Sequence, residues 1–224
     1  MHVAKINIQG NSLVGLYILP LDTAVLVGPE VSKKDRRIVE KVFNLPIIQT
    51  TIAGTGLVGI FAATNGRTLV VPDIIFPHEE SVLEEAGIPF YKIKTNLTCL
   101  GNNVVVSKKG VLLNSDFEED ALTQLQEAFN LPFKIYSLNE IKTIGSFIVC
   151  NSTHGLCSHD FSDEQISELE SFLGIKLTTG TVNLGSTQVK SGLAVNDHGF
   201  IIGELSGGPE IINADEALGF LGGE

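Results

Sequence analysis

The residues best suited to chemistry lie between positions 150 and 159, where cysteines and histidines alternate. Cys150, His154, Cys157 and His159 follow the spacing C-x3-H-x2-C-x-H. Thiolate and imidazole groups are ligands that zinc prefers, so this spacing is compatible with a metal site. A cysteine beside a base and an orienting acid could instead act as a nucleophile. Both hypotheses require these side chains to converge, which depends on the elements that carry them.

Comparison with other parts of the chain favours packing over metal binding. Cys150 stands 44 residues after Val106, and Cys157 aligns with a leucine of the same earlier segment. Both are apolar core positions, and a free cysteine packs as a small hydrophobic side chain. His154 and His198 stand 44 residues apart in equivalent turns. We therefore expect two core cysteines and turn histidines, with no metal ion and no cofactor.

Serine-containing and glycine-rich motifs give no stronger indication of catalysis. The sequence contains neither G-x-S-x-G nor G-x-x-x-x-G-K-[ST]. The stretch G-T-G-L-V-G at Gly54–Gly59 resembles part of a dinucleotide-binding fingerprint, which opens a helix. We expect a strand to follow it, so a nucleotide site is not predicted.

Composition limits the classes of partner. The chain has 224 residues, of which 43% are hydrophobic and 18% are charged, enough apolar material for a substantial core. Fifteen Lys and Arg against 26 Asp and Glu give a net charge of −11. Such a protein gains nothing from counterion release along phosphates, so wrapping of DNA or RNA is not expected. A basic protein partner suits this charge better.

Cysteine usage and the N-terminal sequence indicate where the protein works. Three cysteines without a C-x-x-C pair argue against a disulfide framework and favour a reducing compartment. The first ten residues lack a signal-peptide pattern. The uncharged run Leu45–Gly66 is rich in Gly, Thr and Asn, so we interpret it as strands rather than a membrane span. We expect a cytoplasmic protein.

A repeat organises the whole chain. Short polar turns that end in glycine recur at intervals of 44, 45 and 44 residues, at Gly66, Gly110, Gly155 and Gly199. A helix-exit motif recurs at intervals of 43, 43 and 44 residues, at Leu45, Ile88, Leu131 and Ile175. Two independent features with one period indicate a true repeat.

Each repeat is predicted to have the order strand, glycine turn, strand, helix, strand. In the fourth repeat Ser162 to Gln165 has a capping-box pattern, and Gly174 stands where the helix should end. The last repeat lacks its third strand, which the apolar segment Val3–Ile8 can supply. We therefore predict an α+β fold, a single domain in which five ββαβ repeats close into a pseudo-fivefold ring with helices outside. The expected repeats are residues 10–53, 54–100, 101–144, 145–187, and 188–224 together with 1–9.

Charge is unevenly distributed over the predicted helices. The first helix carries a third of all basic residues, namely Lys33, Lys34, Arg36, Arg37 and Lys41. The second to fourth helices are acidic. Solvated outer faces explain this pattern, and a surface that attracts one sign of partner is the functional alternative.

Small polar residues open the repeats and should gather at one rim around the axis. They are Gly10-Asn11-Ser12, Gly54-Thr55-Gly56, Gly101-Asn102-Asn103, Gly145-Ser146 and Ser191-Gly192. One explanation is that Gly and Asn merely turn the chain there. The other is a flat rim of backbone and amide groups that meets another protein closely.

In several of these segments and others near them, the chain resembles the archaeal form of the translation initiation factor 6 family, which occurs in archaea and eukaryotes. The matching segments are Ile52–Gly59 (I-A-G-T-G-L-V-G), Val70–Asp73 (V-V-P-D), Leu100–Asn103 (L-G-N-N) and Gly180–Ser186 (G-T-V-N-L-G-S), continuing to Asp197. The resemblance implies the pentein fold, a ring of five repeats. It also implies binding to the large (50S) ribosomal subunit, chiefly through an L14-type ribosomal protein near the sarcin–ricin loop. Small (30S) subunit joining would then be blocked sterically.

The resemblance further implies that the rim faces the ribosome. Combined with the small polar rim residues, it predicts ribosome-binding positions at Asn11, Gly15, Thr55, Ile60, Gly101, Asn102, Asn103 and Ser146. Ile60 departs from eukaryotic members, which commonly have Arg there, and this suggests a more apolar contact. We expect a monomer with little direct nucleic-acid contact, no membrane contact and no enzymatic activity.

Two other functions stay open as hypotheses. Some penteins modify guanidino groups with a cysteine nucleophile in the last repeat, but no cysteine follows Cys157 in this chain. A ring-shaped interaction module that works away from the ribosome is the second alternative.

Overall fold

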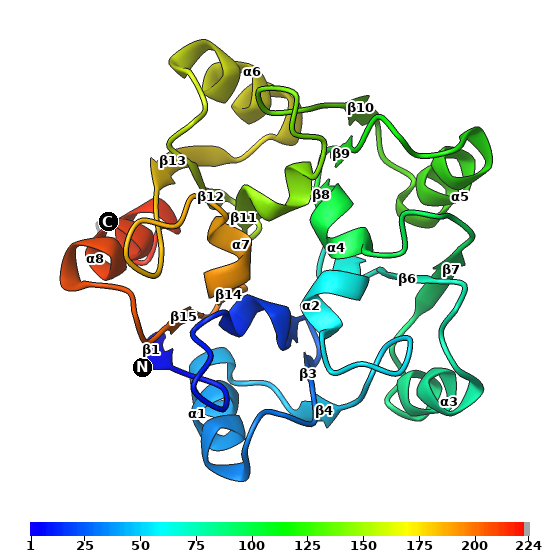
Figure 1. Cartoon of the computed structure of the whole chain (residues 1–224), viewed down its shortest axis with the longest axis horizontal. Coiled ribbons are helices and arrows are strands. Elements are labelled where there is room, and N and C mark those ends of the chain that lie inside the picture. Colours follow the sequence, from blue (N-terminus) through cyan, green and yellow to red (C-terminus); the bar gives the residue numbers. More distant parts are fainter. Residues whose placement is uncertain (222–224) are drawn as a thin grey trace.

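The computed structural model describes residues 1–221, which form five three-stranded sheets around one axis (Figure 1). In chain order the sheets contain β2 (Ile18–Pro20), β3 (Val25–Val27) and β4 (Ile47–Gln49); β5 (Ala63–Thr64), β6 (Leu69–Pro72) and β7 (Phe90–Ile93); β8 (Val104–Val106), β9 (Val111–Leu113) and β10 (Phe133–Ile135); β11 (Ile148–Cys150), β12 (His154–Ser158) and β13 (Lys176–Gly180); and β14 (Leu193–Val195), β15 (Phe200–Gly203) and β1 (Val3–Ile6). The middle strand of each sheet pairs antiparallel with the first strand and parallel with the third.

The N-terminal strand closes the ring, as predicted. β1 pairs with β15 in parallel, with Val3 opposite Phe200 and Ile6 opposite Gly203. The last repeat therefore obtains its third strand from the other end of the chain, which places the two ends of the ring side by side (Figure 1). Closure leaves no repeat with a missing strand.

Five longer helices form the outer layer of the ring (Figure 1). They are α1 (Lys33–Phe43), α3 (Pro77–Glu85), α5 (Glu119–Phe129), α6 (Asp163–Leu173) and α8 (Gly208–Ala217). Ser162 caps α6 by accepting a hydrogen bond from the Gln165 amide, and Gln165 completes the capping box. Gly174 ends α6 in the left-handed conformation, with φ 65°. The predicted start and end of this helix are confirmed.

A second set of very short helices surrounds the axis, and the sequence analysis did not predict it. These are η1 (Val14–Leu16), α2 (Val58–Phe61), α4 (Leu100–Asn103), η2 (Ile144–Ser146) and α7 (Val189–Gly192). The interpretation of Leu45–Gly66 as strands was therefore only partly right, because β4 ends at Gln49 and α2 precedes β5. The expectation of a strand directly after Gly59 was also wrong, because Gly59 lies inside α2.

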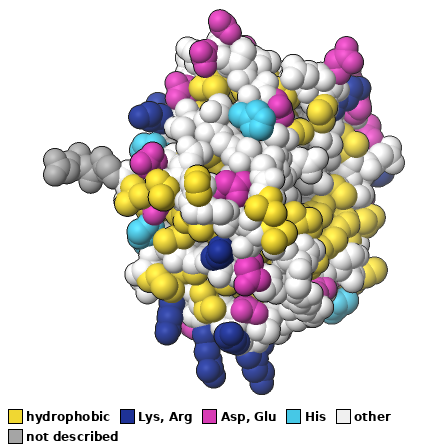
Figure 2. Space-filling model, turned by 60° about the vertical axis from the view of Figure 1, so that its left-hand side comes forward, with side chains coloured by type: hydrophobic (Ala, Val, Ile, Leu, Met, Phe, Trp, Pro, Cys, Tyr) yellow, Lys and Arg dark blue, Asp and Glu magenta, His cyan; other side chains and the backbone are white. Residues whose placement is uncertain are grey.

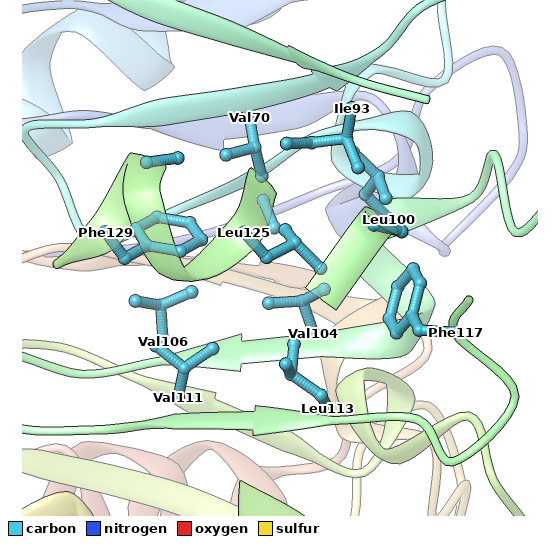
Figure 3. Close-up of a cluster of buried hydrophobic side chains, with 13 residues drawn as sticks. Val70, Ile93, Leu100, Val104, Val106, Val111, Leu113, Phe117, Leu125 and Phe129 are labelled. Carbon is cyan, nitrogen blue, oxygen red and sulfur yellow. The ribbon is translucent and has the colours of Figure 1, made fainter. Parts of the chain in front are cut away.

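Each outer helix packs between two sheets, so neighbouring repeats share their cores. In one buried cluster, Leu125 and Phe129 of α5 lie between Val70 and Ile93 of the second sheet on one side and Val104 of the third sheet on the other (Figure 3). The cluster around α1 likewise combines the first repeat with strands of the last. Burial of this kind couples the repeats, because a repeat removed from the ring would expose the core that it shares with its neighbours.

The ring has two distinct faces. We call the face with the five short helices and the loops around them the rim face. The hairpin turns between the first two strands of each sheet lie on the opposite face, at Gly66 and Gly110 for example. No helix in residues 1–221 combines the length and hydrophobicity that a membrane crossing requires.

Candidate protein-binding rim and axial channel

Tight loops project from the rim face between the repeats. Four of those in residues 1–221 are closed by isolated bridges, at Ile8–Asn11, Ile52–Thr55, Leu138–Ile141 and Val182–Ser186. Their central residues have positive φ, as in the primed turns that join twisted strands; Gln9 (53°) and Gly10 (83°) are one example. The tips therefore hold fixed conformations instead of extending as flexible loops.

A buried carboxylate anchors one of these loops from below. The Glu79 side chain, which is 1% exposed, accepts hydrogen bonds from the amides of Ala53 (2.9 Å), Gly54 (2.8 Å) and Phe76 (2.9 Å), and from the Thr51 hydroxyl. Burial raises the pKa of Glu79, but these hydrogen bonds outweigh it and hold the pKa below its ordinary value. The loop tip at Ala53 and Gly54 is thus fixed to the start of α3, the outer helix that follows it.

The same arrangement recurs in other repeats. Glu210 at the start of α8 accepts from the amides of Leu184 (3.2 Å), Gly185 (2.9 Å) and Gly207 (2.9 Å). Glu118, just before α5, accepts from the Thr95 hydroxyl (2.7 Å), and this bond is the main reason that its pKa lies at about 2. These acidic residues at helix starts therefore hold the rim loops in place by hydrogen bonds, a role that favourable interaction with the helix dipole did not indicate.

A ring of close backbone contacts lies at the centre of the rim face. The second residue of each short helix is Gly15, Gly59, Gly101, Gly145 or Lys190. A Cβ on any of these four glycines would lie well under 3.0 Å from a backbone carbonyl of the preceding repeat. Glycine is therefore required for the short helices to pack this tightly around the axis.

Lys190 is the exception in this ring, and its side chain lines the cavity along the axis. Its Nζ donates a hydrogen bond to the Gly101 carbonyl oxygen, from a position 89 residues away in the sequence. Burial lowers the pKa of the Lys190 ammonium to about 8, although the neighbouring Cys150 acts in the opposite direction. The ammonium thus serves as an internal cation beside the inward-facing carbonyls.

Replacing Lys190 by methionine should change how stability depends on pH. Between pH 8 and 10 the unfolded chain binds a proton that the folded chain has released, so Lys190 makes wild-type stability rise with pH. The Lys190→Met variant lacks this rise. Its free energy of unfolding, compared with wild type, should fall by about 1–2 kcal/mol over this range. Urea unfolding at both pH values measures it, and a pH-independent difference would contradict the buried ammonium.

An axial channel of about 120 Å³ extends from Lys190 toward the opposite face. Its walls are the first strands of the five sheets, and its far mouth includes Asp22, Asn65 and Asp197. Cys150 lies in the wall, and burial raises the pKa of its thiol to about 11. A thiol with this pKa is protonated at neutral pH and is a poor nucleophile. The channel therefore does not have the chemistry that a cysteine-dependent reaction needs.

The cysteine and histidine cluster does not converge on a metal site. Cys157 is fully buried in the core, and burial raises the pKa of its thiol to about 12. His154 packs against Gly219, and His159 pairs with Asp160 at 3.7 Å. Within residues 1–221, no group of three potential ligands is close enough to hold a metal ion. The packing role predicted for Cys157 is confirmed by its place in the core.

All eight predicted ribosome-binding residues lie on the rim face, but they divide into two groups. Asn11, Thr55, Ile60, Asn102 and Ser146 are half-buried and reach the surface. Gly15, Gly101 and Asn103 are buried, and the Asn103 amide bonds to the Cys99 carbonyl (2.9 Å) and to Asn114 (2.7 Å). The second group holds the ring together and offers no side chain to a partner.

Exposed apolar side chains on the rim face were not singled out from the sequence. Leu184 at a loop tip is 75% exposed and Leu205 is 55% exposed, beside a shallow groove that also includes residues 9–13. Figure 2, in which the rim face is turned to the right, shows hydrophobic side chains gathered on that side. Leu184 has φ 64°, a conformation that leucine rarely adopts. In the sequence, the feature that could have indicated an exposed apolar side chain here was a leucine between Asn and Gly in G-T-V-N-L-G-S.

Five three-stranded sheets around a channel, with helices outside, define this protein as a pentein. Among solved structures it is similar to the N-terminal domain of ArgZ, an arginine dihydrolase from cyanobacteria, with a TM-score of 0.53 and 10% sequence identity. The match covers 84% of this chain and 72% of that chain, and at this identity the likeness concerns the fold alone.

The chain belongs to the eIF-6 family, whose family model matches residues 3–217. It is similar to translation initiation factor 6 of Natronomonas pharaonis, with 32% identity over 96% of this chain and 97% of that protein. The factor of the same name from Thermococcus onnurineus is 29% identical over 99% of this chain and 100% of that protein. Family membership makes the chain a translation factor.

Proposed function

We propose that this protein binds the large ribosomal subunit in the cytoplasm and thereby prevents the small subunit from joining. The rim face is the contact surface, and an L14-type ribosomal protein is the chief partner. Membership of a translation factor family supports this proposal. Binding as a monomer is sufficient, because the ring closes on itself and needs no second copy.

The character of the rim face is the observation that carries this proposal. Among the five short helices Lys190 is the single charged residue, and its amine is turned into the ring. Apolar side chains such as Leu184 and Leu205 are exposed around them. A low-charge surface with exposed apolar residues is typical of the centre of a protein interface, which buries about 800 Å² on each partner.

Occlusion of this kind requires no chemistry. A factor that occupies a surface needed by the small subunit shifts subunit association by mass action. Rigidity helps, because loops already held by Glu79 and Glu210 lose little entropy when they bind. Asn11, Thr55, Ile60, Asn102 and Ser146 are the proposed contact residues, around the apolar anchors.

Sedimentation of purified cognate ribosomal subunits tests the proposal directly. Large subunits are centrifuged through sucrose with and without the protein, and small subunits are then added. We expect the protein to co-sediment with large subunits and the joined particle to disappear. Failure to bind intact large subunits would contradict the proposal and favour an interaction module that works elsewhere.

Replacing Leu184 by asparagine should weaken binding to large subunits about tenfold without destabilising the fold. Burial of a leucine side chain contributes about 1.5–3 kcal/mol, and asparagine tolerates the left-handed backbone at this position. Binding is measured with a fluorescently labelled protein. Ile212→Gln on α8 removes another exposed apolar side chain, 54% exposed against 75% for Leu184, and should leave affinity unchanged. Equal effects of both changes would exclude the rim face as the contact.

A further inference from the structure

One outer helix has the opposite charge to the other four. α1 carries five basic and two acidic residues, which gives +3. Counted in the same way, α3 has a charge of −4, α5 of −3, α6 of −4 and α8 of −3. In a ring whose repeats are otherwise alike, this difference distinguishes one edge of the molecule from all the others.

The charges on α1 are exposed and are not neutralised by neighbours. Lys33, Lys34, Arg37 and Lys41 are exposed, and none of the ion pairs found within residues 1–221 involves this helix. Figure 2 shows Lys and Arg side chains projecting from the lower edge, where α1 also lies in Figure 1. Elsewhere several basic side chains face an acidic one, as Lys92 faces Glu80 at 3.2 Å.

Three of these residues form a stripe along the helix. Lys33, Arg37 and Lys41 are spaced by four residues, so they share one face and succeed one another at about 6 Å. Like charges at this spacing repel each other and destabilise an isolated helix slightly. A polyanion lying along the stripe would remove that repulsion.

The chemistry of this edge suits phosphates better than an acidic protein. Protein interfaces depend on apolar or aromatic anchors at their centre, and α1 contributes none of the exposed large hydrophobic side chains of residues 1–221. A row of long cationic side chains without such an anchor matches the phosphate contacts that position proteins on nucleic acids. Because the four other edges are acidic, RNA can approach closely at this one edge.

We propose that α1 is an RNA-binding edge, at which Lys33, Lys34, Arg37 and Lys41 contact the phosphate backbone. This local contact revises the expectation, based on the net charge of the whole chain, of little direct nucleic-acid contact. The pseudo-fivefold ring alone offers five similar orientations to a partner at its rim face. If one edge alone binds RNA, the orientation that places this edge against RNA is favoured over the other four. The charge asymmetry would then determine how the ring is oriented on its partner.

Binding to a 20-base-pair RNA duplex of arbitrary sequence tests this proposal by fluorescence anisotropy. The test variant combines Lys33→Gln, Lys34→Gln, Arg37→Gln and Lys41→Gln. The control combines Arg67→Gln, Lys92→Gln, Lys108→Gln and Lys176→Gln, exposed residues on other parts of the ring. Both variants lose four positive charges from −11 and reach −15, so they differ in where the charge is removed.

We expect the wild-type protein to bind the duplex at low salt and the α1 variant to bind at least tenfold more weakly. The slope of log K against log[KCl] should become shallower by about 0.9 for each phosphate that the variant no longer neutralises. The control should stay within about threefold of wild type, since it removes charge where RNA does not approach. Circular dichroism at matched temperatures verifies that both variants are folded.

Three outcomes would overturn the proposal. The first is equal weakening of RNA binding in the two variants, and the second is no binding by the wild type at 25 mM KCl. The third is displacement of RNA by polyglutamate at equal charge concentration, which would assign the edge to acidic proteins. The duplex assay contains no ribosomal component. Its failure therefore leaves subunit binding through the rim face intact, and failure of subunit binding leaves the RNA edge intact.

Discussion

Gly15→Ala is expected to lower the free energy of unfolding by about 3 kcal/mol or more. The added methyl group would overlap the backbone carbonyl of Lys190, and the Leu193 carbonyl lies 2.8 Å away on another side. Backbone atoms cannot rotate aside as a flexible side chain can, so relief requires the short helices to move apart. That movement would widen the whole central ring and should also reduce binding at the rim face.

Denaturant unfolding of the purified variant measures the effect, with Gly208→Ala as the matched control. Gly208 begins α8, and a Cβ there would meet no atom within 4 Å. The control should be neutral or stabilised by about 0.4–1 kcal/mol, because alanine restricts the unfolded chain. Similar free energies of unfolding for the two variants would contradict this prediction, and would show that the short helices can move apart at little cost.

Glu79→Gln is expected to cost about 2–4 kcal/mol. The carboxylate accepts hydrogen bonds from three amides and one hydroxyl at a site with 1% exposure. Glutamine has one acceptor oxygen, and its NH2 group would face amide donors that then lack an acceptor. Neighbouring Glu80→Gln removes an exposed ion pair with Lys92 and should cost less than about 1 kcal/mol.

The same carboxylate should make the protein sensitive to acid. The folded-state pKa of Glu79 lies below the ordinary value of 4.5, so the stability it contributes is complete above about pH 5 and is lost as pH falls through the folded-state pKa. Wild-type stability should therefore decline as the pH falls below about 5, and the decline should be shallower in Glu79→Gln. Parallel curves for the two proteins would contradict this role of the carboxylate.

The repeat architecture could be predicted because glycine turns and helix ends recur visibly at one period. A residue such as Gly66 or Gly174 occupies a turn or helix end with positive φ that few other residues tolerate, so the spacing of such glycines reports the spacing of elements. Val3–Ile8 was identified as the missing strand by counting elements in the last repeat. These inferences depend on local backbone rules and need no knowledge of distant contacts.

The short helices could not be predicted because three or four residues span about one helical turn, which is too short to show a periodic pattern of apolar residues. The role of Lys190 was not predicted, because its equivalence to Gly15 can be recognised only when the short helices around the axis are known. The predicted site residues all lie on one face of the ring, but sequence alone did not separate Asn102, which reaches the surface, from Asn103, which is buried. That division depends on how two adjacent side chains turn within α4.

Pairing of β1 with β15 has a consequence for protein synthesis. The first strand to leave the ribosome waits for a partner that is made almost 200 residues later. Contacts so distant in sequence are slow to form, and until then the first and last repeats lack part of their shared core. Ring closure therefore cannot take place until translation is nearly complete. A truncated chain that lacks β15 cannot complete the ring, so rim-face binding is expected of finished molecules alone.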